Sequence, residues 1–141
     1  MTALSRNGAV MSAEEIADAN LKKVNLGYRE NFLKKTAKMI ADGEFDLPGI
    51  SKMSYEDAHE ELQLLPGVGP KVADCVLLYG FGNLSAFPND VWVGRAMQKW
   101  YGVGGRKKVA QFAFDRWGGL AGYAQQYLFM LARTELANEK I

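Results

Sequence analysis

The sequence has little of several things that would otherwise decide its class. It contains one cysteine, Cys75, among 141 residues, which excludes an internal disulfide framework and any all-cysteine metal or iron–sulfur site. No apolar run approaches the roughly 20 residues of a membrane-spanning helix. The first residues show no basic segment followed by an apolar stretch, so no secretion signal is expected. These absences favour an intracellular location, in the cytoplasm or nucleoid, or in the nucleus if the source is eukaryotic.

The charge is also nearly balanced, with 17 Lys and Arg against 16 Asp and Glu. Proteins that grip phosphate backbones are usually more basic, so composition alone does not indicate a nucleic-acid binder. Basic residues gather at Lys22–Lys38 and Arg95–Lys108, and acidic residues at Glu44–Glu61; solvated helix faces are the simplest interpretation. With 48% apolar residues, the length suits one domain over residues 1–141 with a single hydrophobic core.

The apolar spacing is helical nearly throughout and predicts an all-α fold without a convincing strand pair. Ser12 with Glu15, and Ser54 with Asp57, have the spacing of helix N-terminal caps. Helices are expected at about residues 13–24, 28–42, 55–65, 71–79, 91–101, 107–117 and 121–138.

A glycine-rich hairpin, Leu65-Pro-Gly-Val-Gly-Pro70, separates two of these helices. Its glycines leave backbone amides uncovered, and the second helix begins at once, so its free N–H groups point outward at the positive end of the helix dipole. Such an arrangement binds anions and suits a DNA phosphate. The alternative is a helix connection without a ligand, but the whole string from Leu65 to Asp74 favours phosphate.

Lys71 follows the hairpin in the first turn of the second helix. The helix dipole disfavours a cation there and, with partial desolvation, would leave more of the free amine. A neutral amine can attack a sugar carbon and form a Schiff base. Alternatively, Lys71 is a surface lysine that contacts phosphate. Asp90 is placed to cap the helix from Val91, and a carboxylate fixed in this way can stabilise positive charge on a sugar; capping alone is the simpler interpretation, and the two roles are compatible.

The stretch Leu62–Val93 resembles the helix-hairpin-helix (HhH-GPD) DNA glycosylase superfamily. Within it, the resemblance is closest to the 8-oxoguanine DNA glycosylase/AP lyases. Further matching strings are Leu26–Arg29, Lys71–Cys75, Gly119–Gln125 and Leu128-Phe129. The resemblance covers nearly all of the chain and places the helix-hairpin-helix at about residues 55–79.

This resemblance implies base-excision repair of double-stranded DNA that contains oxidised guanine. Lys71 would attack C1′, expel the base and, through the Schiff base, promote strand cleavage, with electrostatic help from Asp90. Cys75 and Phe129 would lie against the two faces of the extruded base, and Gln125 would bond its Watson–Crick edge, as base flipping requires. Without the resemblance, Cys75 is better interpreted as a small buried residue and Phe129 as a core aromatic.

The resemblance also implies contacts away from the base. Phosphate contacts are expected at Gly67, Gly69, Val72 and Trp92. A structural K⁺ or Na⁺ is expected on the backbone carbonyls of Gln63, Leu65 and Val68. No cofactor is expected to be required, and no iron–sulfur cluster.

Members of the resembled family are about twice as long as this sequence. Their amino-terminal β-rich domain has no counterpart here, so a truncated catalytic domain is expected. Two alternatives remain open. One is an endonuclease III-like glycosylase for oxidised pyrimidines, a branch that commonly carries a four-cysteine cluster. The other is a helix-hairpin-helix fragment that binds DNA without catalysis or without recognising a base.

Overall fold

The computed structural model describes residues 5, 6 and 9–137. The helices are α1 (Ala13–Asp18), α2 (Arg29–Ala41), α3 (Tyr55–Leu62), α4 (Pro70–Cys75), α5 (Val91–Tyr101), α6 (Arg106–Trp117) and α7 (Ala121–Glu135). Short 3₁₀ turns lie at Lys22–Val24, Pro48–Lys52 and Gly118–Leu120, and a π turn, η3, at Val76–Gly80 continues α4. The predicted all-α fold is confirmed. One small exception is an antiparallel pair of two-residue strands, β1 (Ser5–Arg6) and β2 (Ala9–Val10), too short to produce a pattern in the sequence.

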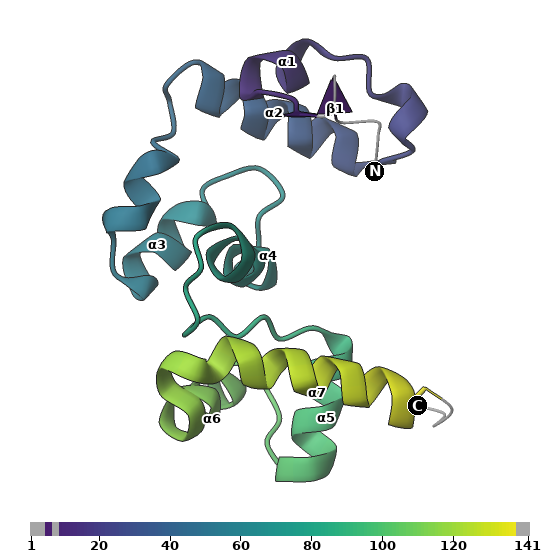
Figure 1. Ribbon diagram of the computed structural model, residues 1–141, viewed down its shortest axis with the longest axis vertical. Helices are drawn as coiled ribbons and strands as arrows, with labels where there is room; N and C mark the ends of the chain where they lie inside the picture. Colours follow the sequence, from purple (N-terminus) through teal and green to yellow (C-terminus); the bar gives the residue numbers. More distant parts are fainter. Residues whose placement is uncertain (1–4, 7–8, 138–141) are drawn as a thin grey trace.

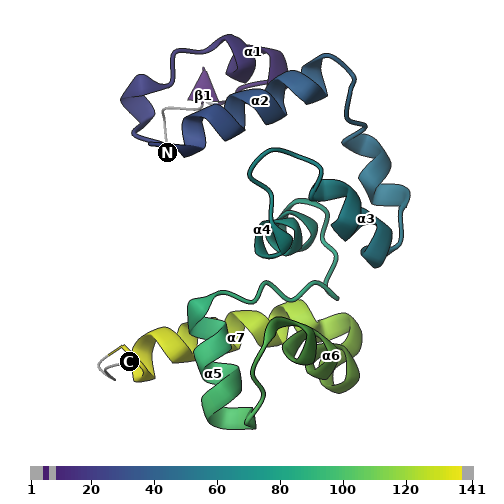
Figure 2. The same ribbon diagram turned by 180° about the vertical axis from the view of Figure 1, so that it is seen from behind.

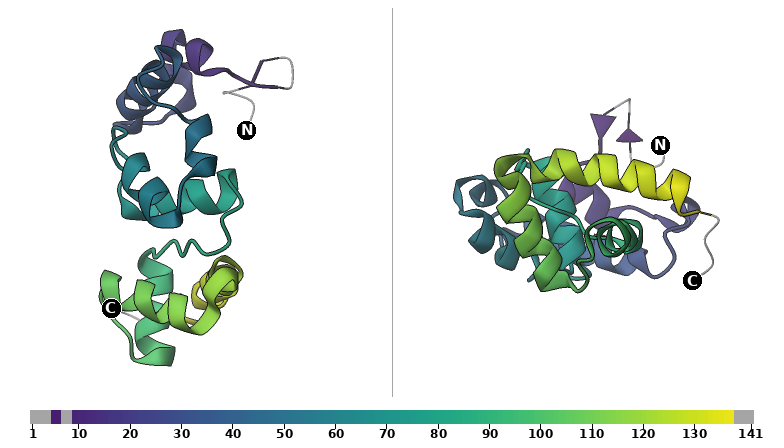
Figure 3. Two further views of the ribbon diagram at one scale, coloured as in Figure 1. Left: turned by 90° about the vertical axis from the view of Figure 1, so that its left-hand side faces the viewer. Right: turned by 90° about the horizontal axis from the view of Figure 1, so that it is seen from below.

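The helices lie in three tiers (Figure 1). α1 and α2 form one end, α3 and α4 the middle, and α5–α7 the other end, as the view from behind also shows (Figure 2). An extended segment, Phe81–Asp90, runs from η3 to α5 along the boundary between the middle and last tiers (Figure 3). This connecting segment therefore determines where α5–α7 stand relative to α4.

The buried apolar residues form two clusters, whereas the chain length suggested a single core. One cluster gathers residues of α5–α7, and the other gathers residues around α3 and α4. Neighbouring residues of the connecting segment enter different clusters: Ala86 is buried with α3 and α4, and Phe87 is buried with α5–α7 and stacks on Trp117. Burial on both sides holds this segment in place, at roughly 25 cal/mol per Å² of apolar surface.

The predicted caps are confirmed, and the first and third helices are shorter than expected. The Ser12 hydroxyl accepts a hydrogen bond from the Glu15 N–H and the Glu15 carboxylate accepts one from the Ser12 N–H. The Ser54 hydroxyl likewise accepts from the Asp57 N–H. The first helix ends at Asp18 rather than near residue 24, because the backbone becomes extended at the next residue. The third ends at Leu62 rather than near residue 65, where the hairpin begins.

Helix α7 docks closely on the connecting segment through a glycine. The Gly122 N–H donates to the Leu84 carbonyl at 2.7 Å. A Cβ at position 122 would collide with the Leu78 side chain and lie 3.3 Å from the Ala86 carbonyl oxygen. Only glycine permits this approach without repacking, and the approach fixes the side chains of the next two turns of α7 against the middle tier. This helix ends at Glu135, where Leu136 is its C-cap, and not near the predicted residue 138, which itself lies outside the described residues.

Candidate active site

Residues of α2 contact the hairpin between α3 and α4 and support it. Gly67 has a positive φ of 78°, and a Cβ at this position would lie 2.6 Å from the Phe32 ring. The Thr36 hydroxyl donates to the Pro66 carbonyl at 3.4 Å. Glycine is therefore required at position 67 by both its backbone angle and its contact with Phe32. The sequence showed the hairpin but not these supports, because they come from a helix 30 positions earlier.

Two of the predicted phosphate-binding amides have no backbone acceptor among the described residues. Gly67 and Gly69 are exposed, and across the described residues neither N–H donates a backbone hydrogen bond. The Val72 N–H differs, because it already donates to the Gly69 carbonyl at 2.9 Å. Trp92 lies on α5, half-buried, with the Arg95 guanidinium 5.0 Å from its ring. Gly67 and Gly69 thus offer unused donors, whereas Val72 could only share its own.

The predicted catalytic and base-pocket residues converge on one cavity. It has a volume of about 160 Å³, which suits one small flat group better than the roughly 300–1,000 Å³ of drug-sized sites. Its walls come from α4 with η3, from the end of the connecting segment and from α7. The lining residues are Lys71, Cys75, Tyr79, Pro88, Asp90, Gln125, Gln126 and Phe129.

Lys71 and Asp90 reach this cavity for separate local reasons. Lys71 is the second residue of α4, directly after its N-cap glycine and Pro70. It is exposed, so the partial desolvation expected from the sequence is not seen in the free protein. Asp90 caps α5, as predicted, with its Oδ1 accepting from the Val93 N–H at 2.9 Å. The cap fixes the carboxylate in a cavity that also contains the lysine.

The base-pocket residues differ in how firmly they are held. Gln125 is 4% exposed, and its side-chain nitrogen donates to the Pro88 carbonyl at 3.1 Å. Cys75 is a free, half-buried thiol. Phe129 is half-buried and packs against the α5–α7 cluster. A buried amide between a thiol and an aromatic ring gives the cavity a polar edge and apolar walls, as a site for a flat heterocycle needs.

Helix α4 also carries a buried carboxylate, outside the cavity, that the sequence analysis did not identify. Asp74 is 9% exposed and accepts a hydrogen bond from the Tyr55 hydroxyl at 2.6 Å. The Phe87 N–H also bonds to this carboxyl. Burial raises the pKa of Asp74, although these hydrogen bonds and the charges of His59 and Arg106 oppose the rise. Burial, followed by the hydrogen bond to Asp74, likewise raises the pKa of Tyr55.

His59 completes this network through both of its ring nitrogens. Its Nε2 lies 3.0 Å from the Pro70 carbonyl, and its Nδ1 lies 3.1 Å from the side-chain nitrogen of Gln63. The same Nε2 lies 3.7 Å from the Asp74 Oδ1. Asp74, Tyr55 and His59 therefore tie α3 to the start of α4 and to the connecting segment.

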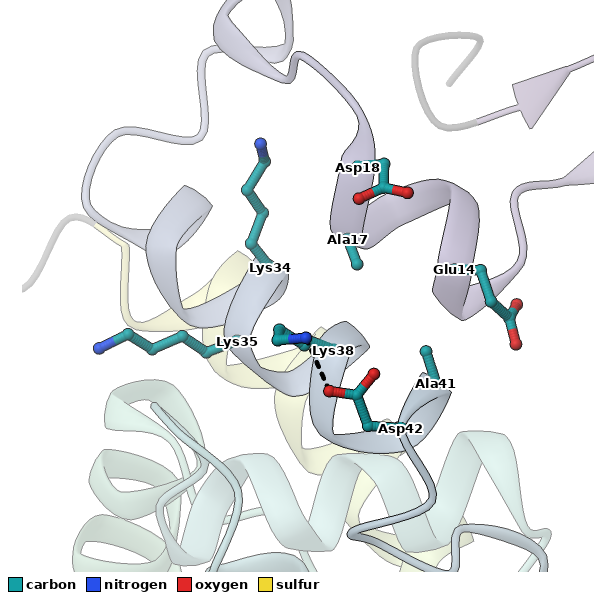
Figure 4. Close-up of a pocket in the computed structure, with 8 residues that line it drawn as sticks. All are labelled: Glu14, Ala17, Asp18, Lys34, Lys35, Lys38, Ala41 and Asp42. Carbon is teal, nitrogen blue, oxygen red and sulfur yellow. Dashed lines mark hydrogen bonds and ion pairs between the residues drawn. The ribbon is translucent and has the colours of Figure 1, made fainter.

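A second cavity, of about 340 Å³, lies between α1 and α2 and lacks a comparable chemical arrangement (Figure 4). It is lined by Glu14, Ala17, Asp18, Lys34, Lys35, Lys38, Ala41 and Asp42. Lys38 pairs with Asp42 at 2.7 Å, and Lys35 points away from the acids. Charges of both signs on exposed helices fit the solvated faces inferred from the sequence.

A search of the described residues finds no group of three or more His, Cys, Asp or Glu side chains that could hold a metal ion. For the predicted monovalent-cation site, the Leu65 carbonyl accepts a hydrogen bond from the Val68 N–H at 3.1 Å. A carbonyl oxygen has a second lone pair, so this bond does not prevent coordination. Within the same part of the chain, none of the helices is long and apolar enough to cross a membrane.

The chain is similar to known proteins in sequence. The helix-hairpin-helix motif family matches residues 55–79. A probable N-glycosylase/DNA lyase of Methanothermobacter thermautotrophicus is 43% identical over 81% of this chain and 37% of its own length. The N-glycosylase/DNA lyase of Saccharomyces cerevisiae is 29% identical over 79% of this chain and 39% of its own length.

A solved structure gives the same result for the fold. The Clostridium acetobutylicum 8-oxoguanine glycosylase/lyase, in complex with double-stranded DNA containing cytosine opposite 8-oxoguanine, matches with a TM-score of 0.81 and 35% identity. The match covers 94% of this chain and 49% of that one. The chain spans about two fifths of the curated relatives and about half of this solved relative. In both sequence and fold, it belongs to the helix-hairpin-helix DNA glycosylase superfamily.

Proposed function

We propose that this chain is the catalytic part of a bifunctional DNA glycosylase/lyase that removes 8-oxoguanine from double-stranded DNA. The observation that carries the proposal is the single cavity lined by Lys71, Asp90, Gln125, Cys75 and Phe129 beside the hairpin. Relatives named N-glycosylase/DNA lyase support the reaction, and the Clostridium complex supports the base.

Lys71 is the nucleophile of the glycosylase step. The lone pair of its neutral amine forms a bond to C1′ while the bond from C1′ to the base nitrogen breaks. The base departs with that electron pair and takes up a proton. Asp90 stabilises the positive charge that develops on the sugar as the base leaves. Loss of a proton and opening of the sugar ring then give the Schiff base between Lys71 and C1′.

The lyase step uses the same covalent bond. The Schiff base accepts electrons, so a proton can leave C2′ while the 3′ phosphate departs with its bonding pair. Water then hydrolyses the Schiff base and restores the Lys71 amine. In this sequence of steps an amine, a carboxylate and water supply all the chemistry, so no cofactor is required.

The remaining residues hold the DNA. Cys75 and Phe129 contact the faces of the extruded base, and Gln125 bonds its edge. The Gly67 and Gly69 amides bind phosphate, which agrees with their unused donors. Val72 and Trp92 are further phosphate contacts in this proposal. A K⁺ or Na⁺ on the carbonyls of Gln63, Leu65 and Val68 would stiffen the hairpin. A substrate of this kind implies an intracellular site of action, in a nucleoid or a nucleus.

Borohydride trapping tests this proposal. A duplex with 8-oxoguanine opposite cytosine should give a covalent adduct that Lys71→Ala abolishes. Lys35→Ala, an exposed lysine that points away from the acidic residues beside it (Figure 4), is the matched control and should trap like the parent. An adduct only on a preformed abasic site would show lyase chemistry without base recognition. DNA binding with no adduct on either substrate would leave a non-catalytic DNA-binding fragment in place of the enzyme.

A further inference from the structure

Two polar side chains of the cavity have no part in the proposed chemistry. Tyr79, on the π turn, and Gln126, on α7, both line it. The Gln126 side-chain nitrogen donates a hydrogen bond to the Tyr79 hydroxyl. These residues are 47 positions apart, so this bond joins two walls of the cavity that come from separate parts of the chain.

Gln126 also fixes the orientation of the neighbouring Gln125 amide. Its nitrogen donates to the Gln125 Oε1 at 2.6 Å, and the Gln125 nitrogen donates to the Pro88 carbonyl at 3.1 Å. A terminal amide can turn over and exchange its oxygen and nitrogen. Turning Gln125 over would set its oxygen against the Pro88 carbonyl, where neither group has a proton. Gln126 and Pro88 therefore hold one orientation.

Counting the hydrogen-bond donors and acceptors of Gln125 and Gln126 shows which of these groups remain available to a ligand. Gln126 has two N–H groups, and it uses them on Tyr79 and Gln125. Gln125 keeps one lone pair on Oε1 and one N–H on its nitrogen. Tyr79 is 61% exposed, and burial of part of its ring, then the charges of Cys75 and Asp90, raise the pKa of Tyr79. The hydroxyl therefore stays neutral and available as the anchor for Gln126.

The orientation of an amide decides which purine edge it recognises. A guanine-type edge presents an N–H donor beside a carbonyl acceptor, whereas an adenine-type edge presents a ring-nitrogen acceptor beside an amino donor. An amide that can turn over pairs with either edge. One that is locked pairs with only one of them at a given position in the pocket.

Resting on the proposed function, we propose that Gln126 is a positioning residue that, anchored by Tyr79, locks the Gln125 amide in the orientation that selects an oxidised guanine over an oxidised adenine. Gln126 acts through Gln125 and does not touch the base. The lock belongs to the free protein and exists before DNA arrives.

Single-turnover kinetics on three duplexes tests the lock, with 8-oxoguanine, 8-oxoadenine or an abasic site at the target position. Gln126→Leu should slow excision of 8-oxoguanine about tenfold, the change expected for one net hydrogen bond. It should reduce the ratio of the excision rates of 8-oxoguanine and 8-oxoadenine and leave the rate of abasic-site cleavage unchanged. Tyr79→Phe should act in the same direction with a smaller loss. Equal losses on 8-oxoguanine and on the abasic site would overturn the proposal, because they indicate a general structural defect.

Matched variants separate this role from a general effect of the substitutions. Gln111→Leu removes an amide of α6 that bonds to Asp115 at 2.8 Å, outside the cavity, and should change neither rate. Tyr127→Phe, at an exposed position of α7, is the control for Tyr79→Phe. In a Gln125→Ala background, Gln126→Leu should cause no further loss on 8-oxoguanine. A further loss there would show that Gln126 does not act through Gln125.

A spectroscopic measurement on the free protein keeps this inference separate from the proposed function. The side-chain amide ¹⁵N–¹H signals of Gln125 and Gln126 should both shift in Tyr79→Phe and stay in place in Tyr127→Phe. Unchanged signals in Tyr79→Phe would overturn the lock. If the signals shift but the parent protein excises no 8-oxoguanine, the proposed substrate fails while the lock between Tyr79, Gln126 and Gln125 stands.

Discussion

Two aspartates lie near Lys71, and they differ in almost every physical respect. Asp90 lies in the cavity, where its carboxylate caps α5 through one backbone N–H. Asp74 lies on the same helix as Lys71, three residues later, and is 9% exposed, with the Tyr55 hydroxyl and the Phe87 N–H as donors. The comparison indicates that a buried, hydrogen-bonded carboxylate holds elements together, whereas a fixed carboxylate beside an amine in a cavity is available for chemistry.

The comparison predicts that the surroundings of the two aspartates can be damaged independently. Changes at Asp90 should cost reaction rate and leave stability nearly intact. Changes at Asp74 and Tyr55 should cost stability, with activity falling only as the folded fraction falls. The variants below run from the largest expected effect to the smallest.

Asp90→Asn should lower the rate of base excision about 10²–10³-fold, the range measured when a group that stabilises transition-state charge is removed. Asparagine caps helices about as well as aspartate, so the free energy of unfolding should change little. Single-turnover excision and urea unfolding measure the two quantities. A large loss of stability in Asp90→Asn would show that Asp90, like Asp74, mainly stabilises the fold.

Asp74→Ala should reduce the free energy of unfolding by about 3 kcal/mol, because it removes the acceptor of the half-buried Tyr55 hydroxyl and of the Phe87 N–H. Urea unfolding followed by far-UV circular dichroism measures this loss. Asp57→Ala, an exposed acid of α3, is the control and should cost far less. A folded Asp74→Ala variant of unchanged stability that no longer forms the trapped adduct would contradict the structural role of Asp74.

Tyr55→Phe should cost about 1 kcal/mol of the free energy of unfolding, because only the hydroxyl that donates to Asp74 is removed. The ring keeps its place beside the α3–α4 cluster. The same unfolding experiment measures the loss, with the exposed Tyr127→Phe as its control. Additive effects in the double variant with Asp74→Ala would contradict a direct bond between the two residues.

The smallest effect is a dependence of stability on pH. The pKa of Asp74 is raised above its ordinary value of 3.8, so the folded protein holds this proton more tightly than the unfolded chain. The resulting stabilisation is present below that value and is lost as the pH rises through the folded pKa. The unfolding free energy of the parent should therefore fall relative to Asp74→Asn as the pH rises from about 4. A parent whose unfolding free energy rises relative to Asp74→Asn over this pH range would reverse the assigned direction.

Local chemistry in the sequence was enough to predict much of the site. The hairpin string, the cap at Asp90 and the helical spacing of Gln125 and Phe129 are short-range patterns, and the structure brings these residues to one cavity with Lys71. The helices were predicted for the same reason, since caps and apolar spacing are local.

What the sequence did not show depends on contacts between distant segments. Tyr79 follows Lys71 and Cys75 at intervals of four, a spacing that could have suggested a third residue on the same wall. Gln126, by contrast, gains its role only from the 47-residue contact with Tyr79. Asp74 looked like one polar residue in an apolar helix until α3 supplied Tyr55. The division of the buried residues into two clusters also depends on where the connecting segment lies.

The π turn at Val76–Gly80 has a consequence for how this chain can change in length. In a π turn the hydrogen bond spans five residues, as from the Phe81 N–H to the Val76 carbonyl, so the turn holds one residue more than an α-helical turn would. Removing a single residue here would restore α-helical winding and leave the direction of the following segment nearly unchanged, because a turn of either kind completes about one circuit of the helix axis. Removing a residue from α4 would instead rotate the residues after it by about 100°. A single deletion should thus be tolerated better within these five positions than in α4.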